Sequence, residues 1–188
     1  MKKGFFRAAA LTAALAAAVS LCACGTAADS SADTETDSTK WGTAAADTIT
    51  LPEGVDSTAL FAATQADSSM YIVFNGIQKR DTGYFSAPNG TLTFTTAATA
   101  EDASLQKFKV AVWKLVDGGT QYVNGSTIYF KTDGTVYTYT IDGLDAAASY
   151  RLTISYDRSS YYLYGQMRVD GVAAMAAAPQ ESDSSASA

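Results

Sequence analysis

Tyr150-Arg-Leu-Thr-Ile-Ser-Tyr156 has the clearest structural pattern in the sequence. Large apolar or aromatic side chains alternate with polar ones, so every second residue points to the same side of an extended chain. This alternation predicts a β-strand with one face in a core and the other in water. Phe108–Val116, around Trp113, is apolar at most positions and predicts a central strand that is covered on both faces.

Asn-Gly and Asp-Gly pairs divide the chain around these segments into short pieces. Asn and Asp tolerate a positive φ and Gly adopts it freely, so such pairs suit tight hairpin turns. They predict antiparallel strands and leave little room for long helices. The pairs are Asn75-Gly76, Asn89-Gly90, Asp117-Gly118, Asn124-Gly125, Asp133-Gly134, Asp142-Gly143 and Asp170-Gly171.

The runs between the turns have the composition of strands. Together they predict an all-β fold, an antiparallel two-sheet β-sandwich over residues 47–172, with one short helical turn at Thr99–Ser104. The expected strands are Thr48–Leu51, Met70–Phe74, Ile77–Lys79, Tyr84–Ala87, Thr91–Thr96, Phe108–Val116, Gln121–Val123, Thr127–Lys131, Val136–Ile141, Tyr150–Tyr156 and Tyr161–Val169.

Leu144-Asp-Ala-Ala-Ala-Ser-Tyr150 resembles the tyrosine corner of fibronectin type III and immunoglobulin-like Greek-key sandwiches. In that motif a Leu and a Tyr six residues apart close the loop before the penultimate strand. This sequence departs from it at Ala146, where the family prefers Pro, and at Ala148, where it prefers Thr. The interval from Trp113 to Leu144 is also short for the family. The resemblance implies a Greek-key architecture and nothing catalytic.

The N-terminus has the features of a signal peptide. Lys2, Lys3 and Arg7 precede an almost purely Ala and Leu run, Ala8–Val19. As a helix this run would span about 18 Å, too little for a hydrocarbon core of about 30 Å. We therefore expect residues 1–23 to be removed after export.

Leu21-Cys22-Ala23-Cys24-Gly25 resembles the bacterial lipobox. The resemblance implies cleavage before Cys24 and diacylglycerol on its sulfur, which would anchor the protein on the extracytoplasmic face of a cell membrane. An ordinary signal peptide cleaved near Ala23 is the alternative, and Cys22 is a poorer acceptor for the lipid. Gly25 gives no inner-membrane retention signal, and a Gram-positive surface is preferred.

Residues 24–46 are predicted to form a flexible tether, because Ala, Ser, Thr and Asp dominate and little apolar surface can be buried. Trp41 is the exception. We expect it to pack loosely on the domain edge, with a contact to lipid or a partner as the alternative. Residues 173–188 are predicted to be a frayed helical turn followed by a disordered tail.

Charge and composition exclude several functions. Of 13 basic residues, three lie in the signal peptide, so ten remain against 19 acidic ones, a net charge of −9. Such a chain repels phosphate backbones, so no nucleic acid partner is expected. Histidine is absent and both cysteines lie at the signal boundary. We therefore expect no cofactor, no internal disulfide, no thiol nucleophile and no cysteine metal site, and the commonest general base and metal ligand, histidine, is missing.

No catalytic motif stands out. Ser104-Leu-Gln-Lys107 has the spacing of penicillin-interacting serine enzymes, but it runs directly into an expected strand. Asp142 and Asp145 could bind calcium from one loop, although a plain turn is the better interpretation. Glu101-Asp102 is interpreted as a solvated corner. A non-enzymatic protein is predicted.

The candidate ligand site depends on how the last two long strands pair. If Asp157–Ser160 is a hairpin loop, Tyr156 pairs with Tyr161 and two further tyrosines face outward beside short hydroxyl side chains. Such a face could stack on sugars, or the rings could simply stabilise neighbouring strands. The predicted site residues are Tyr162, Tyr164, Thr153 and Ser155.

These observations lead to three functional hypotheses. The first is a surface-tethered, non-enzymatic sandwich that binds a protein or glycan. The second is a structural or assembly subunit of an envelope complex. The third is a carboxylate-based hydrolase.

The anchor can be tested by mass spectrometry of the mature N-terminal peptide. We expect diacylglycerol on Cys24, and Cys24→Ala should release the protein into the medium or stall its processing. An unmodified N-terminus that starts at another residue would contradict the lipoprotein hypothesis.

Overall fold

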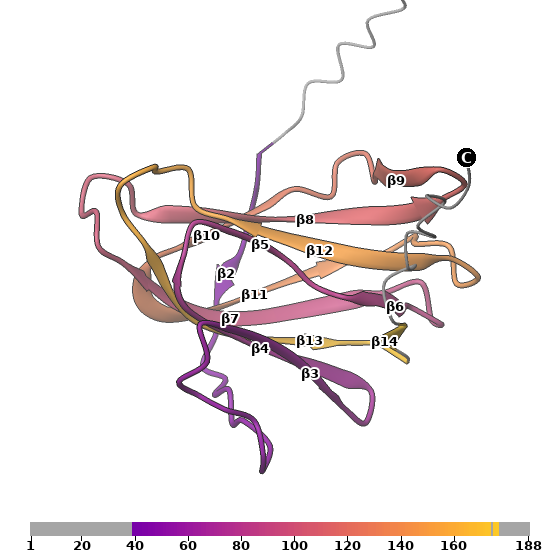
Figure 1. Cartoon of the computed structure of the whole chain (residues 1–188), viewed down its shortest axis with the longest axis horizontal. Coiled ribbons are helices and arrows are strands. Elements are labelled where there is room, and N and C mark those ends of the chain that lie inside the picture. The colour runs from indigo at the N-terminus through magenta and orange to yellow at the C-terminus, as the bar shows by residue number, and fades with distance from the viewer. Residues whose placement is uncertain (1–38, 174, 177–188) are drawn as a thin grey trace, which may run out of the picture. The chain divides into compact units, whose positions relative to one another are not determined.

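The computed structural model describes residues 39–173 and 175–176, which form two β-sheets packed face to face (Figure 1). The described part of the chain has no helix, and therefore none that is long and apolar enough to cross a membrane. The predicted all-β sandwich is confirmed. The predicted signal peptide, Cys24 and most of the predicted tail lie outside the described residues.

Sheet A contains eight strands. Six lie side by side in the order β1-β10-β8-β12-β6-β14, while β5 pairs with β12 and β9 with β8. Their bounds are β1 (Lys40–Trp41), β5 (Lys79–Asp81), β6 (Tyr84–Ser86), β8 (Lys107–Val116), β9 (Gly119–Tyr122), β10 (Ile128–Lys131), β12 (Ser149–Ser155) and β14 (Met175–Ala176).

Sheet B contains six strands in the order β2-β11-β7-β13-β4-β3. All of its pairings are antiparallel. The bounds are β2 (Thr43–Ala44), β3 (Phe61–Ala66), β4 (Ser69–Ile77), β7 (Leu92–Ala100), β11 (Asp133–Ile141) and β13 (Leu163–Asp170).

From β6 onward the chain changes sheet at most of its loops. The strand β7 lies in sheet B, β8 to β10 in sheet A, β11 in B, β12 in A and β13 in B. The orders β6-β12-β8-β10 and β4-β13-β7-β11 make two interlocked Greek keys, the arrangement of a jelly roll. The Greek-key expectation therefore holds, but the strand order differs from that of immunoglobulin-type sandwiches.

The core lies between the inner faces of the two sheets. Phe108 of β8 contacts Phe74 of sheet B and Phe130 of β10, with ring centroids 6.0 and 5.5 Å apart. Along β12 and the residue after it, the inner face is Tyr150, Leu152, Ile154 and Tyr156, all buried as the alternation predicts. Each such side chain contributes about 1.5–3 kcal/mol by its burial.

The prediction for Phe108–Val116 is half right. The strand β8 is central, between β10 and β12, but only one of its faces is covered. Phe108, Val110 and Val112 are buried, whereas Ala111 and Trp113 are half-buried on the outer face. The error arose because an aromatic residue on the wet face gives the same apolar pattern as a core residue.

The sandwich begins before the predicted boundary, so the tether prediction is wrong for residues 40–44. The strand β1 pairs with β10 in sheet A and β2 pairs with β11 in sheet B. Gly42 joins them, and a Cβ there would collide with the ring of Phe130. Trp41 packs on the edge as expected, 42% exposed, with its ring 5.5 Å from that of Tyr129.

The predicted tail is also wrong at its start, because Met175–Ala176 pairs with Tyr84–Phe85. Two smaller predictions fail, and one strand was missed. Thr48–Leu51 is not a strand, and Thr99–Ser104 is the end of β7 followed by a turn. The strand β3 was not predicted, since Phe61-Ala-Ala-Thr-Gln-Ala66 has only one large apolar residue.

Tyr150 makes the hydrogen bonds of a tyrosine corner. Its hydroxyl accepts from the Asp145 amide at 2.7 Å and donates to the Asp145 carbonyl at 3.1 Å, while its ring is 1% exposed. Leu144 is buried beside it and donates its amide to the Gly90 carbonyl at 2.9 Å. The loop before β12 is therefore closed as the resemblance implies.

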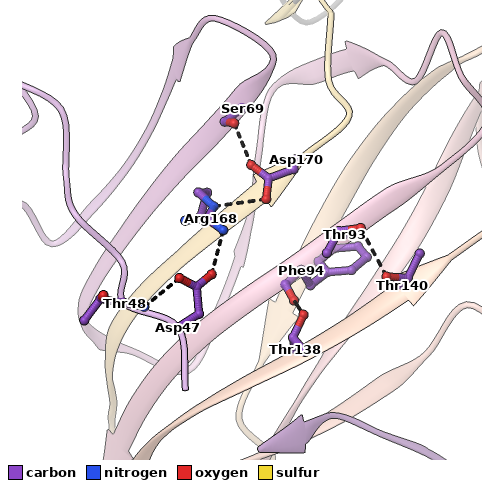
Figure 2. A network of polar contacts seen from close by, with 9 residues as sticks. All are labelled: Asp47, Thr48, Ser69, Thr93, Phe94, Thr138, Thr140, Arg168 and Asp170. Carbon is purple, nitrogen blue, oxygen red and sulfur yellow. Dashed lines mark hydrogen bonds and ion pairs between the residues drawn. The ribbon is translucent and has the colours of Figure 1, made fainter. Parts of the chain in front are cut away.

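Residues 47–49 lie over sheet B and are held there by Arg168 (Figure 2). Arg168 Nη2 donates to Asp47 at 2.8 Å and its Nε donates to Asp170 at 3.0 Å. Asp170 also accepts a hydrogen bond from Ser69 at 2.6 Å. Ile49, the residue after Thr48, is buried, so residues 47–49 cover part of the outer face of sheet B.

We expect Tyr150→Phe to lower the free energy of unfolding by about 1–3 kcal/mol, because two hydrogen bonds at a buried corner are lost. Urea titration followed by fluorescence measures the change. Tyr139→Phe is the matched control, since the Tyr139 hydroxyl has no hydrogen bond among the described residues. Equal stabilities of the two variants would contradict the role of the corner.

The Asp47 contact should depend on pH. Hydrogen bonds from the Thr48 amide and from Arg168 lower the pKa of the Asp47 carboxyl below its ordinary value of 3.8. A lowered folded-state pKa means that the contact is complete above 3.8 and is lost as the pH falls through the lowered value. The Thr48 amide resonance should titrate below pH 3.8, and Asp47→Asn should abolish that titration. A midpoint above 3.8 would exclude the contact.

Candidate functional site

The four predicted site residues do not form one site. Thr153 and Ser155 lie on β12 in sheet A, whereas Tyr164 lies on β13 in sheet B and Tyr162 just before it. The predicted pairing of Tyr156 with Tyr161 is wrong, because β12 pairs with β8, β5 and β6, and β13 with β4 and β7.

The connection between β12 and β13 crosses from one sheet to the other instead of forming a hairpin. Arg158 Nε lies 2.7 Å from the Asp102 carboxylate, which is 12% exposed, and Gln78 donates to the Ser159 carbonyl at 2.6 Å. These contacts hold the connection against two other loops. They depend on residues distant in sequence, so local turn signals could not reveal them.

On sheet B the two tyrosines share one carboxylate. The Tyr164 hydroxyl donates to Glu101 Oε1 at 2.6 Å and the Tyr162 amide donates to Oε2 at 3.1 Å. The hydrogen bond to Glu101 raises the pKa of Tyr164. Tyr162 is 43% exposed and Tyr164 half-buried. Tyr164 lines a shallow pocket of about 390 Å³, together with Asn75 and Gln166.

The polar groups of that pocket are largely engaged in holding the chain. Asn75 donates to the carbonyls of Ser57 and Ala59, both at 2.9 Å. Gln166 is directed to the Ile49 carbonyl at 3.5 Å. The Tyr164 hydroxyl is bound to Glu101. These contacts fix the 47–60 segment on sheet B and favour a structural role for this face.

On sheet A the hydroxyl residues meet aromatic ones. Thr153 and Ser155 line a pocket of about 470 Å³ on the outer face, with Trp113, Tyr122 and Thr127 among the other lining residues. Trp113 and Tyr122 are directly opposite in the β8–β9 hairpin, and their rings meet edge to face at 5.6 Å. Edge-to-face packing at this distance stabilises both rings.

The sequence places these two rings on the outer face. In β8 the buried residues Phe108, Val110 and Val112 fix the inner side, so Trp113 must point outward. The hairpin turns at Asp117–Gly118, and Gly118 has a φ of 82° that suits the tight turn.

Hydrogen bonds orient the polar groups of the pocket. The Tyr122 hydroxyl lies 2.9 Å from that of Thr127 and accepts from the Thr127 amide at 3.1 Å. Thr153 donates to the Asp81 carboxylate at 2.5 Å. Lys109 pairs with Asp157 at 2.9 Å. The pocket therefore combines two aromatic rings with hydroxyl and charged groups.

Two buried donors near the rings have no acceptor among the described residues. They are Nε1 of Trp113 and Nε of Arg151, and these two residues are directly opposite across β8 and β12. Unsatisfied buried donors are uncommon and require an explanation. Violations of this rule concentrate at functional sites, so the two unsatisfied donors favour a functional site on the outer face of sheet A.

Trp113 and Tyr122 are functional candidates that the sequence did not indicate. Lys107, Lys109, Ala111 and Trp113 alternate with the core residues of β8, and this period of two was the available signal. It was obscured because Ala111 and Trp113 are apolar.

The other chemical motifs have structural roles. Ser104 donates to Asp102 in a turn before β8, so the Ser104–Lys107 spacing does not form a catalytic helix. Asp142 accepts from Thr91, and Asp145 pairs with Lys114 at 2.8 Å. Within residues 39–173 and 175–176, no group of acidic residues is arranged to hold a metal ion.

Comparison with known proteins gives a structural likeness and no match in sequence. No protein-family model and no curated protein matches the sequence. Among solved structures, the chain is similar to the CBM22-1–GH10 modules of the Clostridium thermocellum N-terminal endo-1,4-β-D-xylanase 10B, complexed with xylohexaose. The identity is 10%, the TM-score 0.36, and the match covers 63% of this chain. It spans about a quarter of that structure, 26%. This likeness is too weak to describe the chain, so its fold and its site are described from its own strand pairing and side chains.

Proposed function

We propose that this protein is a non-enzymatic glycan-binding module, held on the extracytoplasmic face of a bacterial membrane by lipid on Cys24. The ligand binds the outer face of sheet A. The observation that supports this most directly is the Trp113–Tyr122 pair at a pocket with hydroxyl and charged lining residues.

A sugar ring has an apolar face and hydroxyl edges, so its receptor needs flat rings beside hydrogen-bonding groups. Trp113 and Tyr122 supply the rings. The hydroxyls of Thr127, Thr153 and Ser155 line the same pocket. That of Thr153 donates to Asp81 and can accept from a sugar hydroxyl, and that of Ser155 can donate or accept. A protein partner would more commonly require a larger apolar centre.

The ionisation of the carboxyl groups favours binding over hydrolysis. A carboxylate hydrolase needs one carboxyl group whose pKa is raised, so that it can act as an acid. Among the described carboxyl groups with a shifted pKa, every net shift of the pKa is downward. These groups are Asp47, Asp56, Asp102, Asp133 and Asp145. At Asp133 burial, which raises the pKa, is the largest single effect, and hydrogen bonds together with Lys131 outweigh it.

The location on the membrane is supported by the N-terminal sequence alone, through the resemblance of Leu21–Gly25 to a lipobox. A structural or assembly subunit is the alternative function. Sedimentation of the chain from residue 25 onward distinguishes them, because an assembly subunit should self-associate or bind an envelope partner in place of a glycan.

Trp113→Ala and Tyr122→Ala should each weaken glycan binding by about 1 kcal/mol or more, because each removes a stacking surface. A glycan array identifies the ligand, and titration calorimetry with it gives the affinity. Thermal unfolding of each variant shows whether the sandwich remains folded.

The double variant Tyr162→Ala, Tyr164→Ala is the matched control, since it removes two aromatic rings from the opposite sheet. It should leave glycan affinity unchanged. If this control loses glycan binding while Trp113→Ala still binds, the glycan site is on sheet B and the proposal for sheet A is wrong.

A further inference from the structure

Basic side chains are divided unevenly between the two sheets. Of the ten in the described residues, the strands of sheet A contain eight, against one acidic residue. The strands of sheet B contain one basic and two acidic residues, and the loops one basic and ten acidic ones. An acidic protein thus has one basic sheet. Its basic residues are Lys40, Lys79, Arg80, Lys107, Lys109, Lys114, Lys131 and Arg151.

Four of these lysines lie together on the outer face, and we term Lys79, Lys107, Lys109 and Lys131 the lysine patch. Lys131 is directly opposite Lys107. Lys109 is opposite Ser155, which is itself opposite Lys79. Neighbouring strands are about 4.8 Å apart and alternate residues about 7 Å apart, so the four ammonium groups occupy two adjacent rows.

This arrangement brings like charges together, although Asp157 pairs with Lys109 and the Asp133 carboxylate is attracted by Lys131. Like charges directly opposite each other destabilise a sheet, and Lys107 and Lys131 are such a pair. The Lys107 ammonium lies over the rings of Tyr129 and Trp41, 5.0 and 5.8 Å from their centroids, which partly offsets the repulsion. Among the described residues, one acid, Asp157, forms an ion pair with the patch.

The lysine patch is continuous with the aromatic pocket. Lys79 and Lys109 line the same pocket as Trp113 and Tyr122. The pocket therefore has an aromatic end and a basic end, and Lys107 and Lys131 extend the basic end along β8 and β10. A ligand with an apolar ring face at one end and negative charge at the other would complement both ends.

We infer that the ligand is an acidic glycan, whose carboxylate or phosphate groups pair with the lysine patch while a sugar ring stacks on Trp113 and Tyr122. This inference rests on the proposed function and specifies its substrate class. The ten acidic residues in the loops repel a polyanion elsewhere, so charge complementarity directs it to sheet A.

The test uses pairs of polysaccharides that share a backbone and differ in negative charge. Pectin of low and high methyl esterification forms one pair, and carboxymethyl- and hydroxyethyl-cellulose form another, printed beside phosphate-bearing and neutral bacterial wall glycans. Residues 25–188 should bind the acidic member of a pair about tenfold more tightly. That preference should fall about tenfold between 0.05 and 0.5 M salt, because exposed charges are screened.

The variant Lys79→Gln, Lys107→Gln, Lys109→Gln, Lys131→Gln should lose this preference and its salt dependence, so that the acidic and neutral members of each pair bind with equal affinity. Lys114→Gln is the matched control. Lys114 is on the same strand but pairs with Asp145 away from the patch, so its loss should change neither quantity.

Equal binding of acidic and neutral glycans, insensitive to salt, would overturn this inference and leave glycan binding intact. Binding to none of the glycans would overturn both. Tighter binding of phosphatidylglycerol vesicles or mixed-sequence single-stranded DNA than of any acidic glycan would overturn the assignment to a glycan and assign the patch to that polyanion.

Discussion

The long strands β4, β7, β8, β11, β12 and β13 each have one face in the core, because side chains alternate along a strand. The inner faces are filled by Phe74, Phe108 and Phe130, and the loop before β12 is closed by Tyr150. The two outer faces are left free to differ. Sheet B is covered in part by residues 47–49, whereas sheet A presents aromatic rings and lysines.

The sandwich could be predicted because its strand signals are local. The alternation in Tyr150–Tyr156 gave the correct buried face, and the Leu144–Tyr150 spacing gave the correct corner. The domain limits could not be predicted in the same way. Residues 40–44 join the sheets mainly through backbone pairing and through the space that Gly42 leaves beside Phe130, and neither has a strong signature in composition.

The candidate site was less accessible from the sequence, because it depends on which strands become neighbours. Thr153 and Ser155 were predicted with the correct orientation but with the wrong companions. The connection after β12 crosses to the other sheet, and there Arg158 contacts Asp102, which is 56 positions earlier in the chain. Trp113 looked like a core residue by type, and only the period of two along β8 assigns it to the outer face.

The short strands on either side of Gly42 affect how the protein responds to a pulling force. The strand β1 is held to β10 by two residue pairs and β2 to β11 by two more, so a pulling force from the N-terminal side meets these short pairings first. Peeling them away separates Trp41 from Tyr129 and opens the side of Phe130, but leaves the long strands in place. The five residues from Lys40 to Ala44 would add about 17 Å of extended chain. A protein pulled from this end would therefore lengthen before it unfolds, as an extensible link does under load.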